Sequence, residues 1–532
     1  MSSQTPVVGK SSPGPEPKPQ EGVRGHPWLT LLTVGIGVMM VALDGTIVAI
    51  ANPAIKNDLK ASLADVQWIT NGYLLALAVA LITAGKLGDR FGHRQTFLVG
   101  VVGFALSSGI IGLSGSVSLL VTFRVLQGLF GALLMPAALG LLRATFPAEK
   151  LNTAIGIWGA VIGASTAGGP IVGGLLVEHV NWESVFFINV PVGVLALLMG
   201  LAILVDHRAE RAPRSFDLPG IVLLSSAMFC LVWAIIKAPD WAWGDTKTIG
   251  FLVASAVLLV AFTVWESRVT EPLLPLSLFR SVPLSAGTVL MVLMAFGFMG
   301  GIFFVTFYLQ NVQGMSPVKS GLHLLPLTGI MIVSSPLAGA LITKIGPRVP
   351  LVAAMSVTCV ALFGMSTLDV DSSTVVTSAW FALLGLGLAP VMVGATDVIV
   401  GNAPLEHAGV AGGLQQSAMQ IGGSLGTAVL GAVTASRVHE ELPTRWAEEK
   451  QLPPLKPEQA DQLKEGAEVG LAPQLPNVPE QVNDAIARVV HGSFIDGMGR
   501  AFLFAGVVGA VASVVAVFTK QGKNDAGPSV HV

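Results

Sequence analysis

The chain has 532 residues, of which 52% are hydrophobic and only 12% are charged. Soluble domains usually contain about 25% charged residues, so this composition indicates an integral membrane protein. The net charge of -2, without a basic stripe, argues against nucleic acid as a partner. Membrane-spanning helices need about 20 mostly apolar residues. Such stretches recur along nearly the whole chain, which leaves little sequence for a soluble domain.

Residues 1–27 are polar and Pro-rich and lack the features of a signal peptide, so they are predicted to be a disordered cytoplasmic tail. The apolar runs that follow predict fourteen membrane-spanning helices. We expect these helices at residues 29–51, 67–86, 95–114, 118–142, 152–177, 184–205, 216–237, 249–265, 284–309, 320–343, 350–367, 375–400, 409–436 and 500–519. The helix at 216–237 is interrupted early by Pro219, and the helix at 249–265 is short.

Lysine and arginine are more frequent in the short connections that share a side with the N-terminus than in those on the other side. This bias predicts that both termini are cytoplasmic. Residues 437–499 form the only long connection and would lie outside the cell. Its Pro-rich, acidic sequence predicts two short amphipathic helices, which form either a lid or partner site or a tolerated surface insertion.

The first predicted helix contains a carboxylate, Asp44, six or seven residues before its expected outer end at Asn52 and Pro53. Arg124 lies about as far from the outer end of the helix at 118–142, and Asn71 falls in the same layer. With a rise of about 1.5 Å per residue, Asp44 and Arg124 both lie roughly 9 to 10 Å below the outer surface. Charges in hydrocarbon are costly and usually mark a transport pathway.

These depths suggest that Asp44 takes up a proton from outside and that Arg124 favours its ionised form. The alternative for Asp44 is a structural bond to the backbone at a helix break near Gly45 and Pro53. For Arg124 it is a fixed ion pair or a bond to a carbonyl group.

Two connections have related sequences, GKLGDRFGHR at 85–94 and GALITKIGPR at 339–348. The matched pairs are Gly85 with Gly339, Leu87 with Leu341, Arg90 with Lys344, Gly92 with Gly346, and Arg94 with Arg348. Each connection is expected to form a tight glycine turn, with Asp89 of the first pairing with arginine or lying against a helix N-terminus. Thr343 replaces Asp89 in the second copy. Such repeats indicate a transporter that rocks around a central site.

Several motifs together resemble the major facilitator superfamily, and within it the fourteen-helix drug:proton antiporters of the EmrB/QacA type. They are LDGTIVAIANP (43–53), GKLGDRFGHR (85–94), RVLQGLFGALLMP (124–136), GASTAGGPIVGG (163–174), FINVPVG (187–193) and FYLQNVQGMSP (307–317). The resemblance implies an all-α fold with a 6+2+6 arrangement of helices. Its parts would be a six-helix half at 28–205, two linking helices at 206–270, a second half at 271–519 that includes the loop 437–499, and a cytoplasmic tail at 520–532.

The resemblance also assigns roles to residues of these motifs. Arg124 would act with Asp44 in proton coupling. The conformational loop motif would comprise Gly85, Asp89, Arg90, Gly92 and Arg94. The antiporter motif would comprise Gly169, Pro170, Gly173 and Gly174; the alternative for these residues is a Gly-rich packing face. Candidates for the substrate cavity are Asn71, Gln127, Phe303, Phe307, Gln416 and Gln420. His323 is either a proton relay or a packing histidine.

The predicted function is therefore proton-coupled export of lipophilic drugs or antibiotics across the cell membrane by a monomer. It needs the proton gradient and no cofactor or metal. The chain contains no phosphate-binding loop, nucleophile elbow or HExxH motif, which argues against an enzyme. The alternatives are an exporter or flippase of an endogenous lipid or secreted metabolite, and a membrane-embedded enzyme or sensor.

Overall fold

The computed structural model describes residues 23–61, 63–205, 217–453, 463–475 and 478–520. The two predicted tails lie almost wholly outside these residues, as do residues 206–216 and part of the long connection. All regular structure in the described residues is helical. Among them, 14 helices are long and apolar enough to cross a membrane, which confirms the predicted fold class and number.

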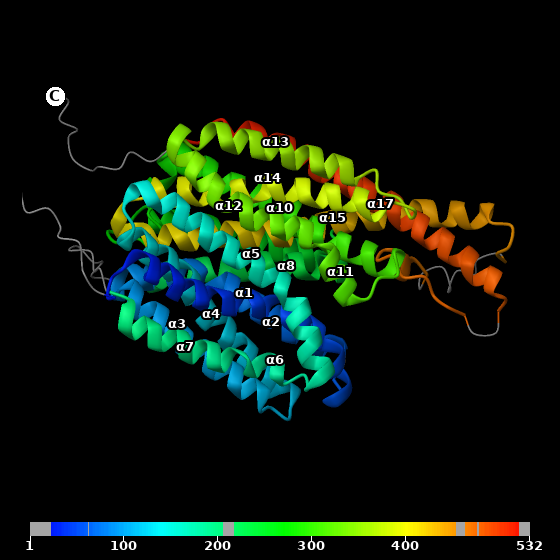
Figure 1. The fold of residues 1–532 in the computed structure, drawn as a ribbon, viewed down its shortest axis with the longest axis horizontal. Helices are drawn as coiled ribbons and strands as arrows, with labels where there is room; N and C mark the ends of the chain where they lie inside the picture. The colour runs from blue at the N-terminus through cyan, green and yellow to red at the C-terminus, as the bar shows by residue number, and fades with distance from the viewer. Residues whose placement is uncertain (1–22, 62, 206–216, 454–462, 476–477, 521–532) are drawn as a thin grey trace, which may run out of the picture.

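The elements follow one another closely along the chain (Figure 1). The first group consists of α1 (Pro27–Asp58), α2 (Leu63–Phe91), α3 (His93–Gly112), α4 (Val117–Thr145), α5 (Ala148–His179), α6 (Ser184–Phe187), α7 (Asn189–Ile203), α8 (Leu218–Trp241) and α9 (Thr246–Glu266). The second group consists of η1 (Leu276–Arg280), α10 (Val282–Phe307), η2 (Tyr308–Val312), α11 (Pro317–His323), α12 (Leu325–Ile345), α13 (Arg348–Met365), α14 (Thr374–Gly401), η3 (Leu405–His407), α15 (Ala408–Glu448) and α17 (Glu480–Ala516).

Helix α1 does not end at Asn52 and Pro53, as its sequence predicts, but continues to Asp58. The added turn is stabilised by burial, because Ile55 packs in an apolar cluster with Ala51 and Ile69. The prediction that Pro219 interrupts α8 is also wrong. Pro219 does not interrupt this helix but lies in its first turn, where its missing N–H costs nothing, and the Asp217 carboxylate caps the helix.

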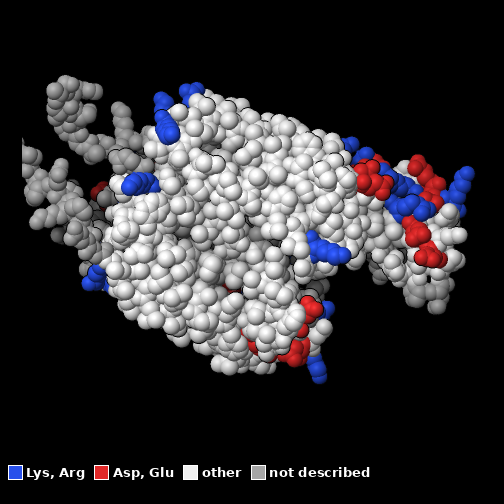
Figure 2. All heavy atoms as spheres, in the orientation of Figure 1, with Lys and Arg blue, Asp and Glu red and all other residues white. Residues whose placement is uncertain are grey.

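The start of α1 and the end of α17 lie at one end of the bundle, which we call the terminal end (Figure 1). Helices α15 and α17 project together beyond the other helices at the opposite end, which we call the hairpin end. Charged side chains gather towards the two ends on the face shown in Figure 2, and the surface between them carries almost none. This distribution is the one expected of a bundle that crosses a bilayer.

The projecting helices correct the prediction for residues 437–499. In place of two separate short helices, α15 continues to Glu448 and α17 begins at Glu480. Of the residues that the structure describes between them, 463–467 form a short helical segment. These parts share a small apolar core, in which Val438 and Leu442 of α15 pack with Val489 and other buried residues. Burial of these residues explains why both helices continue past the membrane-spanning part.

The first and second groups of helices meet chiefly along two helix pairs, α2 with α15 and α5 with α12. A Cβ atom added to Gly85 would lie 2.2 Å from the carbonyl oxygen of Gly409, and one added to Gly339 would lie 2.3 Å from that of Asn152. Gly85 and Gly339 therefore each allow the backbone of a neighbouring helix to come close, at corresponding positions of the two copies. The matched turns also agree, because Gly92 and Gly346 both have positive φ, 100° and 79°. The 6+2+6 division itself remains a prediction.

Candidate functional site

Asp44 and Arg124, which were placed at the same depth from the sequence, form a buried ion pair. Arg124 Nη1 donates to Asp44 Oδ2 at 2.5 Å, and the two residues are 1% and 0% exposed. Helix α1 is continuous here, and each described partner of the carboxylate is a side chain. The proposed backbone cap at a helix break is therefore wrong.

Arg124 is held by several groups besides Asp44. Its Nη1 also donates to Gln127 Oε1 at 2.8 Å, and its Nε donates to the carbonyl oxygen of Ile69 at 3.1 Å. The guanidinium carbon lies 4.1 Å from the centre of the Tyr73 ring, a cation–π distance. Both structural alternatives for Arg124, an ion pair and a carbonyl bond, therefore describe real contacts in this conformation.

The second carboxylate oxygen of Asp44 accepts two further hydrogen bonds. Gln127 Nε2 and Asn189 Nδ2 each donate to Asp44 Oδ1 at 3.1 Å. Asn189 also donates to Ser108 Oγ at 3.0 Å, and Ser108 in turn donates to the carbonyl oxygen of Phe186 at 2.9 Å. We call Asp44, Arg124, Gln127, Asn189 and Ser108 the Asp44 network. Its members are all at most 1% exposed.

Sequence reasoning missed Asn189 and Ser108. Asn189 is part of the quoted FINVPVG motif, so a signal was present. Its position depends on the break at Ile188, where α6 ends and α7 begins. Gln127 was expected to contact substrate, but both ends of its amide are bonded to Asp44 and Arg124, so it is unavailable to a ligand in this conformation.

The Asp44 network supplies the hydrogen-bond donors and the positive charge that an ionised carboxylate needs. Its three donors cover both oxygens of Asp44, and the adjacent guanidinium balances the charge. Asn71, predicted at the same depth, is half-buried and is not one of these donors. The Asp44 side chain has no exposed surface, so it does not contact solvent in this conformation.

The glycines of α5 pack against the helix that carries Asp44. A Cβ atom on Gly169 would lie 1.9 Å from Thr46 Oγ1, and one on Gly173 would lie 2.8 Å from Ile47 Cγ1. Gly174 faces Val318 at 3.8 Å. The motif thus brings α5 directly against α1, one turn or less from Asp44. Helix α5 is continuous through Pro170.

Asp89 of the loop motif lies in the last turn of α2 and contacts α15, in the second group of helices. Its Oδ1 accepts from the backbone N–H of Gly409 at 2.7 Å, and its Oδ2 accepts from that of Val410 at 3.0 Å. These groups form the N-terminus of α15, so the second of the two expected partners is confirmed. At the matched position, Thr343 Oγ1 accepts from Asn152 Nδ2 at 3.2 Å.

The two arginines of the loop motif lie around this contact. The guanidinium carbon of Arg90 is 5.3 Å from the centre of the Phe91 ring. Arg94 Nη2 donates to the carbonyl oxygen of Leu201, on α7, at 3.3 Å. The motif therefore connects α2 to α15 through Asp89, and α3 to α7 through Arg94.

The other candidates for the substrate cavity are spread over α10 and α15. Phe303 is 42% exposed and its ring lies 4.9 Å from that of half-buried Phe307. Gln416 is buried and its Nε2 lies 3.8 Å from Met135 Sδ, whereas Gln420 is half-buried. In this conformation the structure does not bring these residues together with the Asp44 network.

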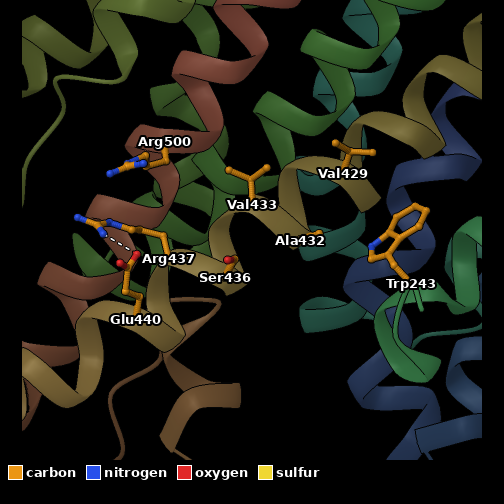
Figure 3. Close-up of a pocket in the computed structure, with 8 residues that line it drawn as sticks. All are labelled: Trp243, Val429, Ala432, Val433, Ser436, Arg437, Glu440 and Arg500. Atoms are coloured by element: carbon orange, nitrogen blue, oxygen red, sulfur yellow. Dashed lines mark hydrogen bonds and ion pairs between the residues drawn. The ribbon is translucent and has the colours of Figure 1, made fainter. Parts of the chain in front are cut away.

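Two hollows lie towards the hairpin end. The first, of about 460 Å³, lies between α15, Arg500 of α17 and Trp243 of the α8–α9 connection; its mouth carries the ion pair of Arg437 with Glu440 (Figure 3). The second, of about 520 Å³, includes His323, whose Nε2 lies 2.9 Å from Thr377 Oγ1. Burial lowers the pKa of His323, which favours the neutral ring.

Comparison with known proteins identifies the family. The chain is 68% identical over 507 residues to the tetracenomycin C resistance and export protein of Streptomyces glaucescens, covering 95% of this chain and 94% of that one. It is 35% identical to the puromycin resistance protein pur8 of Streptomyces alboniger, over 81% and 85% of the two chains. With the multidrug resistance protein Stp of Mycobacterium tuberculosis, the identity is 36% over 77% and 76%.

A solved structure shares the fold. The human organic anion transporter MFSD10 superimposes with a TM-score of 0.60 at 11% identity, covering 92% of this chain and 99% of that one. Residues 34–427 match the family model of the Major Facilitator Superfamily. The chain therefore belongs to the Major Facilitator Superfamily of membrane transporters.

Proposed function

We propose that this protein exports a lipophilic antibiotic across the cell membrane in exchange for protons, with tetracenomycin C as the first compound to test. The observation that carries the proton exchange is Asp44, a carboxylate with 0% exposure, bound inside the membrane-spanning bundle. The 68% identity to a tetracenomycin C resistance and export protein supports the choice of compound.

The Asp44 network suggests how a proton is exchanged. A buried charge is costly, so Asp44 is stable as an ion only while its donors are in place. When α1 and α4 move apart, the carboxylate loses Arg124 and gains a proton. Arg124 keeps Gln127 Oε1, the Ile69 carbonyl and the Tyr73 ring as partners. The guanidinium of Arg124 can therefore stay charged without Asp44.

The glycines of α5 transmit this change to the rest of the bundle. Gly169 and Gly173 touch Thr46 and Ile47, so any shift of α1 beside Asp44 must also move α5. Helix α5 packs on α12 of the other half. Protonation of Asp44 would thereby change which end of the bundle is open, as alternating access requires.

The bundle is proposed to work as a monomer with both termini in the cytoplasm. The terminal end would then face the cytoplasm and the hairpin end the outside. The substrate would bind between the halves against apolar and amide side chains such as Phe303, Phe307, Asn71 and Gln420. Apolar walls of this kind discriminate weakly between compounds of similar size.

The test is uptake of tetracenomycin C into inverted membrane vesicles that contain the protein. An imposed pH gradient, acidic inside, should drive accumulation, and a protonophore should abolish it. Vesicles without the protein give the background. Accumulation that persists without any gradient would contradict exchange for protons, and no accumulation of this compound would contradict the proposed substrate.

A further inference from the structure

A second buried acidic site lies at the terminal end, far along the bundle from Asp44. Asp217 caps α8, and its Oδ1 accepts from the backbone N–H of Gly220 at 3.0 Å and from Trp265 Nε1 at 2.8 Å. Glu266 is the last residue of α9, and its two oxygens accept from the N–H groups of Leu273 at 3.2 Å and Leu274 at 3.4 Å. The two acids are 7% and 4% exposed.

The two carboxyl groups face each other. A Cβ atom built on Gly220 would lie 2.1 Å from Asp217 Oδ2 and 2.8 Å from Glu266 Oε1, so both oxygens point towards the same place. Asp217 Oδ2 is buried and receives no N–H or O–H from any residue that the structure describes.

Two ionised carboxylates cannot form a hydrogen bond, because both are acceptors only. A buried oxygen without a donor is costly, and two like charges at one site repel each other. One proton between the two groups removes both costs: it supplies the missing donor and reduces their joint charge to that of a single carboxylate.

The surroundings match a pair that carries one negative charge. Lys86 of α2, which is 3% exposed, lies near both acids and donates from Nζ to the carbonyl oxygen of Pro272 at 2.7 Å. The other titratable groups facing Lys86 are Asp89, already bound to the N-terminus of α15, then Glu271 and His407. Burial, and then the Lys86 charge, lower the pKa of His407, so it adds no second cation.

We propose that Asp217 and Glu266 together bind one proton, and that this proton holds the segment Pro272–Leu274 between the α8–α9 pair and Lys86 of α2. Loss of the proton leaves two carboxylates in contact, which separates the start of α8 from the end of α9. Glu266 then either moves together with the segment Pro272–Leu274 or loses its hydrogen bonds to Leu273 and Leu274. Since Lys86 lies one turn from Asp89, this change reaches the contact between the two halves.

The sign of the pH dependence follows directly. The pair holds its proton at low pH and loses it as the pH rises. The protein should therefore be compact at this site under acidic conditions and looser under alkaline conditions. Proton binding here does not depend on the exported compound, so the test measures protonation and leaves the export proposal unaffected.

The experiment is an infrared pH titration of the full chain in lipid nanodiscs, following the carbonyl stretch of protonated carboxyl groups. Among the carboxyl signals that the wild type loses as the pH rises, one should belong to this pair. Both Asp217→Asn and Glu266→Gln should lack it, since each replaces the shared proton with a fixed N–H donor and keeps the backbone acceptor. The matched control is Asp245→Asn, which changes the cap of α9 at the hairpin end and should leave the signal intact.

Trp265 provides a second measurement, because its indole is bonded to Asp217. Subtracting the fluorescence of Trp265→Phe from that of the wild type gives the contribution of Trp265, and this contribution should change with pH. The same subtraction, made between two proteins that both carry Glu266→Gln, should give a contribution that does not change with pH. The proposal is overturned if the wild type shows no titrating carboxyl signal, or if that signal persists in both Asp217→Asn and Glu266→Gln.

Discussion

Asp44 and Asp89 are both buried aspartates of the first group of helices, but they are bound in different ways. Side chains of the same group surround Asp44, namely Arg124, Gln127 and Asn189. Asp89 is bound by backbone N–H groups of α15, at Gly409 and Val410. Side chains can turn away without unfolding a helix, whereas backbone donors move only with their helix. Asp44 is therefore suited to exchange partners as the helices move, and Asp89 to hold α2 against α15.

The largest effect is expected for Arg124→Ala. The change leaves Asp44 buried without its cation, which typically costs about 3 to 5 kcal/mol unless the carboxylate takes up a proton. Thermal unfolding in lipid should show this loss, and it should be smaller at acidic pH, where Asp44 becomes neutral. An unchanged unfolding temperature at neutral pH would mean that the pair contributes nothing.

Gly169→Ala should follow, because the new Cβ would lie 1.9 Å from Thr46 Oγ1. Forcing α1 and α5 apart should cost about 1 to 3 kcal/mol and weaken transport. The matched control is Gly168→Ala, since a Cβ there would meet nothing within 4 Å. Equal effects of the two changes would show that close packing against α1 is not what the motif provides.

Asp89→Ala removes both acceptors from the start of α15 and should cost about 1 to 2 kcal/mol, as for other lost helix caps. Thr343→Ala, at the matched position of the second copy, removes only the acceptor of Asn152 and should cost less. Cross-linking yield between α2 and α15 would report the loss of contact in Asp89→Ala, and the yield between α5 and α12 would report it in Thr343→Ala. A larger loss of stability in Thr343→Ala than in Asp89→Ala would contradict the proposal that the first loop contact is the stronger of the two.

The smallest effect is expected for Arg445→Ala in the projecting hairpin. The pair of Arg445 with Asp496 has partly exposed side chains, 39% and 36%, and such pairs usually contribute about 0 to 1 kcal/mol. Stability and transport should change little, and added salt should reduce the difference further. A severe transport defect would instead assign the hairpin a direct role in export.

The sequence alone predicted the parts of this architecture that depend on local pattern. Apolar run length predicted the 14 membrane helices, and rise per residue placed Asp44 level with Arg124. Gln127 follows Arg124 by one turn, so helical spacing could also have placed it in the network. The turns at Gly92 and Gly346 were predicted because only glycine adopts such backbone angles easily.

Other features depend on tertiary packing and could not be predicted in this way. Asn189 reaches Asp44 because the chain breaks at Ile188 and turns the side chain inward. The ends of α1 and α15 were placed too early, because distant residues bury their last turns. The pair Asp217–Glu266 joins the start of one helix to the end of another, and no spacing in the sequence indicates that contact.

The most direct test of the account is release of protons from inverted vesicles on addition of tetracenomycin C, compared between the wild type and Asp44→Asn. Asn keeps the size of the side chain and one oxygen for Arg124, but it cannot gain or lose a proton. The wild type should release protons on addition of the compound, and Asp44→Asn should release almost none while still binding the compound. Proton release by Asp44→Asn at the wild-type rate would contradict the account.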